Sequence, residues 1–346
     1  MTTKPSHTAK AALAPGERPT LKTIAALVGM SVPTVSRALS DAPDIGKSTK
    51  EKVRAVAAEL GYQPNRAGLR LRTGKTNVIA LVLRTDNDGM NSNTAELITS
   101  IASTLRNTPY HVIVIPYFPD ESPMNPIRYI VQTRSADGVI LNRIQPDDPR
   151  VALLQKSGIA VATYGRTLNC ENEAYYDFDN EVFGANCVEQ LVKRGRKNFL
   201  LIAPPREQSY SGHLIQGATD AAVRSGAKMA ILDGADNDSN NAELVAALTT
   251  KLTQSPEIDG VICPAARAAV STTLALETLG RHLGQDIDIV AKEAVPFLRA
   301  FREDIVVVSE DVGRAGSFLA RAVTHAIDSP SQPPMQSLDK RVSPTD

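Results

Sequence analysis

The chain of 346 residues contains no tryptophan, and aromatic residues make up only 4% of it. Aromatic platforms for sugars or unpaired bases must therefore be few. Three cysteines, Cys170, Cys187 and Cys263, form no C-x-x-C pair and leave one unpaired in any disulfide scheme, so reduced thiols in a cytoplasm are expected. No stretch approaches the roughly 18 consecutive apolar residues of a membrane helix. Residues 1–18 have no apolar run of signal-peptide length and are expected to form a disordered arm.

Motifs of the common catalytic classes are missing as well. The sequence has no G-x-G-x-x-G, no G-x-x-x-x-G-K-[ST] and no G-x-S-x-G. Its five histidines contain no pair three or four residues apart, which disfavours a helical zinc site. Asp177, Asp179 and Asn180 could suggest metal ligation, but Asp179 and Asn180 directly precede a helical stretch and are more simply a helix cap. We therefore expect that the protein is not an enzyme and that it binds neither a cofactor nor a metal ion.

The formal net charge of zero hides an uneven distribution along the chain. Residues 1–76 contain thirteen Lys and Arg against five Asp and Glu, a balance of +8, whereas the remainder carries 25 basic and 33 acidic residues, a balance of −8. The basic amino-terminal part is therefore the part suited to a polyanion such as DNA. The length allows two or three domains.

Residues 20–61 have the pattern of three short helices. Thr20 can cap the first helix, and Gly29 can end it in the left-handed region. Ser31 can cap a second helix with Pro33 in its first turn. An S-x-x-E capping box formed by Ser48 and Glu51 is expected to start the third. Two helices joined by a tight turn and braced by a third form a helix-turn-helix unit, although an ordinary three-helix subdomain would show the same pattern.

The next segment, residues 65–76, is predicted to be a conditional hinge. Pro64 blocks continuation of the third helix, and Asn65 can cap a short helix as far as Arg72. Such a helix is marginal by itself because it is short and contains Gly68. Arginines suit phosphates and the minor groove, and an apolar side chain such as Leu71 suits insertion between base pairs.

Three motifs in this part of the chain resemble the lactose-repressor (LacI/GalR) family of bacterial transcription regulators. They are T-x-x-x-I-A-x-x-x-G-x-S-x-x-T-V-S-R, K-V-x-x-x-x-x-E-L-G-Y-x-P-N and L-R-T-G-K-T. The resemblance implies that the second helix lies in the major groove, with Leu71 as a wedge in the minor groove at the operator centre. The DNA-contacting residues that it implies are Thr20, Val32, Pro33, Thr34, Ser36, Arg37, Thr49, Tyr62, Asn65, Arg70, Leu71 and Arg72.

From residue 77 onward, short apolar and β-branched runs alternate with helix-length segments. The nine predicted strands are residues 78–83, 112–115, 138–141, 160–163, 199–203, 229–232, 260–263, 287–290 and 305–308. This alternation predicts an α/β core (77–328) of two doubly wound parallel-sheet subdomains with a break near 176–180, behind an all-α helix-turn-helix domain (19–64). The family resemblance implies a core like that of periplasmic binding proteins. Residues 329–346 are expected to form a Pro- and Ser-rich tail.

Open parallel sheets bind ligands beyond the carboxyl ends of their strands, so the polar residues that follow those ends are candidate effector contacts. These are Asp86, Asn87, Asn142, Arg143, Arg166, Tyr210, His213, Lys292 and Glu293. Several departures from the family pattern make the effector uncertain. The arginine of R-x-x-G is missing at Leu214, with His213 as a substitute, and the usual A-N-D-x-x-A begins at Pro264 and loses both polar side chains.

Together these features predict a cytoplasmic, ligand-responsive repressor that binds a palindromic operator as a homodimer. Its effector is expected to be a sugar, acting either as inducer or as corepressor, and its targets are expected to be carbohydrate uptake and utilisation genes. The motifs RAGLRLRTGKTN, ADGVI, YDFDN and KEAVPFL resemble those of repressors that control α-glucoside uptake genes. The alternative is an enzyme with an attached helix-turn-helix, such as a DNA-binding sugar kinase. A periplasmic binding protein is disfavoured by the first 72 residues.

Overall fold

The structure is a computed structural model that describes residues 18–62, 70, 74–85 and 92–341. The chain divides into two compact units, residues 1–76 and 77–346, which we call the headpiece and the core. The residue-level predictions for the amino-terminal arm, and those for Asn65, Leu71, Arg72, Asp86 and Asn87, lie outside the described residues.

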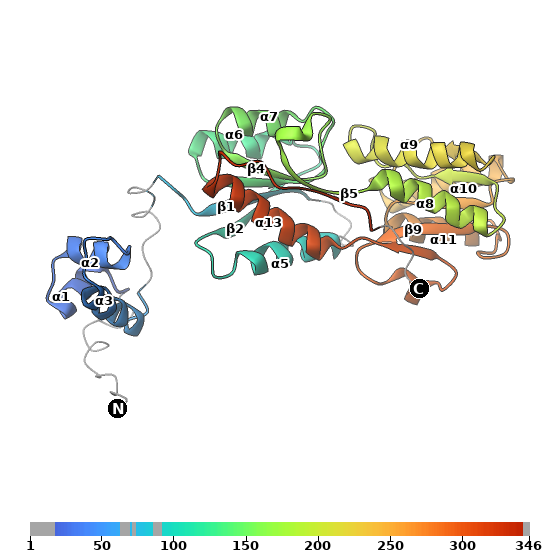
Figure 1. Ribbon diagram of the computed structural model, residues 1–346. Coiled ribbons are helices and arrows are strands. Elements are labelled where there is room, and N and C mark those ends of the chain that lie inside the picture. Colours follow the sequence, from blue (N-terminus) through green and yellow to red (C-terminus); the bar gives the residue numbers. More distant parts are fainter. Residues whose placement is uncertain (1–17, 63–69, 71–73, 86–91, 342–346) are drawn as a thin grey trace. The chain divides into compact units, whose positions relative to one another are not determined.

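Residues 18–62 of the headpiece form the helices α1 (Leu21–Val28), α2 (Val32–Leu39) and α3 (Lys47–Glu59), shown in blue in Figure 1. The Thr20 side chain accepts a hydrogen bond from the backbone of Thr23, and Gly29 ends α1 in the left-handed region at φ 70°. Ser31 caps α2, as predicted. Because α1, α2 and α3 each bury one stripe, the fully buried Ile24, Val35 and Val53 share one small core.

The capping box predicted at the start of the third helix is wrong. The helix already begins at Lys47, with Gly46 in extended conformation at the cap position and no side-chain hydrogen bond to the first turn. Ser48 therefore lies within the first turn of α3, after the N-cap position, and cannot cap the helix.

The core contains two parallel sheets, and the α/β class predicted from the sequence is confirmed. The first sheet has the order β11-β5-β4-β3-β1-β2 and the second β10-β9-β8-β6-β7, with every neighbouring pair parallel. The strands are β1 (Val78–Arg84), β2 (His111–Tyr117), β3 (Gly138–Leu141), β4 (Ala160–Tyr164), β5 (Ala174–Phe178), β6 (Asn198–Leu201), β7 (Lys228–Ile231), β8 (Gly260–Cys263), β9 (Asp288–Glu293), β10 (Val306–Ser309) and β11 (Gln336–Asp339). All nine predicted strands are present, with ends that differ by at most three residues.

Helices cover both faces of each sheet (Figure 1). In the first subdomain, which holds the first sheet, α5 (Ser92–Leu105) and α13 (Val312–Asp328) lie on one face, whereas α6 (Met124–Thr133) and α7 (Pro149–Lys156) lie on the other. In the second subdomain, α8 (Asn180–Lys193) and α9 (Ser209–Arg224) cover one face, and α10 (Asn241–Gln254) and α11 (Ala266–Thr278) cover the other. Two short helices complete the described core, η2 (Cys170–Asn172) and α12 (Leu298–Phe301).

Two strands of the first sheet, β5 and β11, were not predicted from the sequence. In β5 the polar Asp177 interrupts a short run, and β11 is a polar edge strand in the segment expected to be a tail. The chain passes to the second subdomain between β5 and α8, and it returns between β10 and α13. The first subdomain is therefore built from two separate stretches of chain.

Among the described residues, no helix is both long enough and apolar enough to span a membrane.

Candidate functional site

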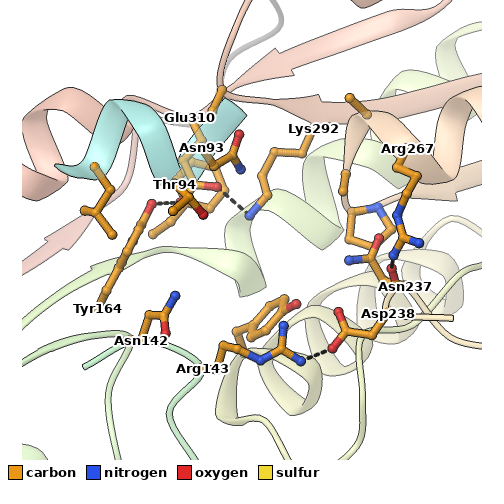
Figure 2. A pocket seen from close by; sticks show the side chains of 18 of the residues that line it. Asn93, Thr94, Asn142, Arg143, Tyr164, Asn237, Asp238, Arg267, Lys292 and Glu310 are labelled. Atoms are coloured by element: carbon orange, nitrogen blue, oxygen red, sulfur yellow. Dashed lines mark hydrogen bonds and ion pairs between the residues drawn. The ribbon is translucent and has the colours of Figure 1, made fainter. Parts of the chain in front are cut away.

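A cavity of about 900 Å³ lies between the two subdomains, at the carboxyl ends of their strands (Figure 2). Lining residues include Arg84 at the end of β1, Tyr164 at the end of β4 and Phe178 at the end of β5. From the second subdomain come Pro264 after β8 and Lys292 near the end of β9. This is the position that open parallel sheets use for ligands, and the volume lies within the range of small-molecule sites.

Five of the residues predicted as effector contacts line this cavity: Asn142, Arg143, Tyr210, Lys292 and Glu293. Two others, Arg166 and His213, are not among its lining residues. His213 lies on α9 with its Nδ1 buried and without a hydrogen-bond partner among the described residues. Burial, with Arg166 adding to the effect, lowers the pKa of His213, so its ring favours the neutral form.

The carboxylate of Glu310 connects the two subdomains at the cavity wall. Its Oε2 lies 2.7 Å from Nζ of Lys292 on β9, and its Oε1 accepts a hydrogen bond from the hydroxyl of Tyr164 on β4. Lys292 Nζ also lies 4.7 Å from the ring centroid of Phe178. Figure 2 shows Lys292 and Glu310 directed toward each other. Because Glu310 follows β10 at the point where the chain returns to the first subdomain, a movement between subdomains would strain these contacts.

A second charged cluster lies around Asp238, which follows β7. Its carboxylate forms an ion pair with Arg143 (Figure 2). The same carboxylate lies 3.5 Å from the Arg84 guanidinium. Arg143 has φ 56°, and the buried Arg150 supports its loop by donating to the carbonyls of Asn142 and Arg143 at 3.1 and 2.9 Å. Arg150 is therefore a support for the effector-facing loop that the sequence did not reveal.

The buried carboxyl of Asp177 lines the cavity beside Arg166. Their closest atoms, Oδ2 of Asp177 and Nε of Arg166, are 3.1 Å apart. Burial nevertheless raises the pKa of Asp177 from 3.8 to about 7, because desolvation of the carboxylate outweighs the attraction of Arg166. Glu310 and Asp179 raise it further, and Lys292 opposes them.

This raised pKa predicts how the stability of the core depends on pH. The folded state holds a proton on Asp177 between pH 3.8 and about 7, while the unfolded state does not, so the contribution of Asp177 to stability is present below pH 4 and is lost as pH rises toward 7. We expect an Asp177→Asn variant to lose less thermal stability than the unaltered protein between pH 5 and pH 8, measured by circular dichroism melting. Parallel curves for the two proteins would contradict the assignment.

The cavity lining includes the buried atoms Oδ1 of Asn142, Oδ1 of Asn237 and Oγ of Ser209, which have no hydrogen-bond partner among the described residues. Buried polar groups are normally paired, so these atoms mark positions where a ligand or ordered water supplies the partner. Burial raises the pKa of Tyr210 to about 12, which keeps its hydroxyl protonated. Within the described residues, no group of three or more His, Cys, Asp or Glu side chains is placed to hold a metal ion.

Reasoning from strand ends missed several cavity residues. Asp238 and Asn237 follow β7, which carried no polar signal in the sequence analysis. Arg267 is the fourth residue of the segment that begins at Pro264 and has lost the two polar side chains of the family pattern, yet it lines the cavity and donates to the carbonyls of Asn237 and Ser239. Tyr164 directly follows the predicted strand 160–163 and ends β4, and this position was the available signal.

In the headpiece, the outward face of α2 carries the side chains predicted to contact DNA. Pro33 and Arg37 are exposed, whereas Val32, Thr34 and Ser36 are half-buried. The Thr34 hydroxyl lies 2.8 Å from the Ser31 hydroxyl, and Arg37 forms an ion pair with Asp44.

The remaining predicted contacts are positioned by local structure. The Thr20 side chain is part of the cap of α1, Thr49 lies in the first turn of α3, and Tyr62 packs against the headpiece core. Arg70 is helical, and its carbonyl accepts a hydrogen bond from the Gly74 amide at 2.8 Å. The roles of these residues in DNA contact stay predictions.

A helix-turn-helix unit carried by the same chain as a two-subdomain core, with a large cavity that contains polar side chains in its walls, defines a ligand-responsive DNA-binding regulator. Residues 20–65 match the family of bacterial regulatory proteins called the lacI family, and residues 76–314 match the periplasmic binding proteins and sugar-binding domain of the LacI family. The chain therefore belongs to the LacI family.

Individual relatives agree with this assignment. The transcriptional regulator RafR of Escherichia coli is 35% identical over 214 residues, which are 61% of this chain and 63% of RafR, so the alignment covers slightly less than two thirds of that protein. The structure of a CelR–cellobiose complex has a TM-score of 0.68 at 23% identity and covers 95% of this chain and 99% of its own. The lac repressor dimer bound to operator and an anti-inducer has a TM-score of 0.79 at 18% identity, with 95% and 98% covered.

Proposed function

We propose that this protein is a cytoplasmic transcriptional repressor that binds a palindromic operator as a homodimer and responds to an uncharged sugar in the cavity. Membership of the family and the similarity to a lac repressor dimer bound to operator support the operator and the dimer. A dimer with two-fold symmetry matches a palindromic site. A sugar that binds one arrangement of the subdomains better than another would change operator affinity through the hinge.

The charge pairing in the cavity carries the proposal for the effector. Among the described residues, four basic and four acidic side chains line it. Lys292 is paired with Glu310, and Arg143 with Asp238. Asn142, Asn237 and Ser209 each carry a buried side-chain atom that has no hydrogen-bond partner among the described residues. These atoms are neutral, and they suit the hydroxyl groups of a ligand. A neutral polyhydroxylated ligand therefore satisfies the site, whereas a phosphate or carboxylate would have to compete with pairs that already exist.

A ligand panel on the full-length protein tests this proposal. We expect at least one neutral sugar among glucose, galactose, maltose, cellobiose, melibiose and raffinose to raise the melting temperature by several degrees, because binding to the folded state stabilises it. Glucose 6-phosphate and glucuronate serve as charged controls and should give no shift. A shift with either charged control and none with the neutral sugars would contradict the proposal.

The direction of the response is measured on DNA. A palindromic duplex selected from a randomised library by the full-length protein serves as the operator probe in fluorescence anisotropy. Release of this duplex by the bound sugar identifies an inducer, and tighter binding identifies a corepressor. Sugar-dependent nucleotide hydrolysis by the purified protein would instead support the alternative of a DNA-binding sugar kinase.

A further inference from the structure

Phe297 differs from the other aromatic residues of the cavity. Four aromatic side chains line it, and three of them are buried or half-buried: Tyr164, Phe178 and Tyr210. The hydroxyl of Tyr164 donates a hydrogen bond to Glu310, and the ring of Phe178 faces Nζ of Lys292. Phe297 by contrast is 43% exposed. In a chain with no tryptophan and seven phenylalanines, an exposed ring on a cavity wall is an unusual use of an aromatic side chain.

The ring of Phe297 is supported from one side. Phe301 on α12 stacks on it with 5.7 Å between centroids and 16° between ring planes. The Arg302 guanidinium lies 5.7 Å from the Phe301 centroid, and Arg302 is itself paired with Glu277 on α11. An exposed aromatic ring that is already stacked on a second ring loses little conformational freedom when the apolar face of a ligand packs against it.

The backbone of Phe297 is also fixed before any ligand binds. Oε2 of Glu293 accepts hydrogen bonds from the backbone amides of Phe297 and Leu298, at 3.0 and 2.8 Å. Glu293 is 6% exposed, and the Leu298 side chain is fully buried. Glu293 was predicted to contact the effector, but these two bonds use its carboxylate to hold the segment that carries Phe297.

We propose that Phe297 forms an outer subsite on which the apolar face of a second glycosyl unit rests, so that the cavity selects oligosaccharides over monosaccharides. This inference rests on the proposed sugar effector. A pyranose ring presents polar hydroxyls at its edge and C–H groups on its faces, which match the polar atoms of Asn142 and Asn237 and the ring of Phe297 respectively. The volume of about 900 Å³ is near the upper end for small-molecule sites and leaves room for more than one ring. Glu293 acts as a positioning residue.

Titration calorimetry on the full-length protein tests the subsite with the sugars of the panel. Phe297→Ala should weaken binding of the di- or trisaccharide by about tenfold, which corresponds to about 1.4 kcal/mol. Binding of its component monosaccharide should change less than about twofold, and Phe297→Tyr should retain oligosaccharide affinity because it keeps the ring. Equal losses for both sugar sizes, or no loss for either, would overturn the subsite. If no sugar of any size binds the unaltered protein, the proposed effector fails and the subsite fails with it.

The absence of tryptophan offers a direct optical readout. A Phe297→Trp variant contains one tryptophan, so its emission reports on this position alone. We expect the oligosaccharide to shift this emission and to protect it from acrylamide quenching, with no such change for the monosaccharide. Tyr129→Trp provides a matched control, because Tyr129 is an exposed aromatic on α6 that does not line the cavity. An equal response in both variants would contradict stacking at Phe297.

The role of Glu293 is tested by the ratio of oligosaccharide to monosaccharide affinity. Glu293→Ala removes the acceptor for both backbone amides and should lower this ratio toward the Phe297→Ala value. Glu293→Gln keeps a carbonyl oxygen as acceptor and should recover most of the ratio. A loss of affinity for both sugar sizes in Glu293→Ala, without a change in ratio, would show that Glu293 contacts the inner sugar instead.

Discussion

Replacing Gly217 with alanine should cost the core about 3 kcal/mol or more of unfolding free energy. A Cβ atom on this glycine of α9 would lie 2.0 Å from the carbonyl oxygen of Glu181 and 2.8 Å from its Cα. Both are backbone atoms of the first turn of α8, so no side chain can rotate away. On α8, a Cβ on Gly184 would likewise lie 2.6 Å from the carbonyl oxygen of Leu214. The two helices therefore pack backbone to backbone, and alanine must force them apart.

Gly212 on the same helix is the matched control. A Cβ there meets no heavy atom within 4 Å, and the backbone is not left-handed. Gly212→Ala should therefore be neutral or stabilise by up to about 1 kcal/mol, the helix-propensity difference. Urea unfolding followed by circular dichroism compares the two variants. Equal stabilities would show that α8 and α9 can separate at little cost.

The displacement caused by Gly217→Ala should also reach the cavity. The amino-terminal turn of α9 carries Ser209 and Tyr210, and the amino terminus of α8 carries Asn180, all of which line the cavity. At a temperature where Gly217→Ala is still folded, its affinity for the sugar should be lower than that of the unaltered protein. The Gly212→Ala control should keep the affinity of the unaltered protein.

Replacing Arg37 with alanine should weaken binding to the selected palindromic operator by roughly 10- to 100-fold. The substitution should also relax the base preference at one position of each half-site. Both effects are expected from the loss of a base contact that contributes about 1–3 kcal/mol. Arg37 is exposed on the outward face of α2, where its side chain is 57% accessible, and its partner Asp44 is also exposed. An exposed pair of this kind contributes little to folding, so the substitution should leave the headpiece intact.

Arg54→Ala is the control for charge alone. Arg54 lies on α3, is 50% exposed and pairs with Asp41, so its removal also deletes one positive charge and one surface ion pair. Its loss should weaken operator and random DNA alike. Anisotropy titrations of both duplexes at fixed salt compare the variants. If Arg37→Ala weakens both duplexes equally, Arg37 contacts phosphate rather than a base edge.

The headpiece could be predicted residue by residue because its signals are local. The side chains of Thr20 and Ser31 accept hydrogen bonds from backbone amides three residues ahead. Gly29 ends α1 through its own left-handed conformation. The failure at Ser48 is also local, because the helix is capped by an extended Gly46, two residues before Ser48.

The cavity was only partly predictable, because its walls depend on contacts between distant parts of the chain. Asn142 and Arg143 could be found since they follow a buried strand directly. Asp238 and Arg267 could not, because Asp238 lies in the loop after β7 and Arg267 in the first turn of α11, and the fold alone brings these two segments together at the cavity. Likewise, the polar strand β11 is stabilised mainly by pairing with β5, and its own sequence favours a loop.

The return of the chain to the first subdomain has a consequence for biosynthesis. The helix α13 shares one face of the first sheet with α5, and β11 completes its edge, so this face and this edge remain only partly covered on the ribosome until residues 312–339 have emerged. The second subdomain, encoded in the middle of the chain, has all its strands before that point. Premature termination after β10 would thus damage the amino-terminal half of the core, and a nascent chain paused there would present the apolar face under α13 to chaperones.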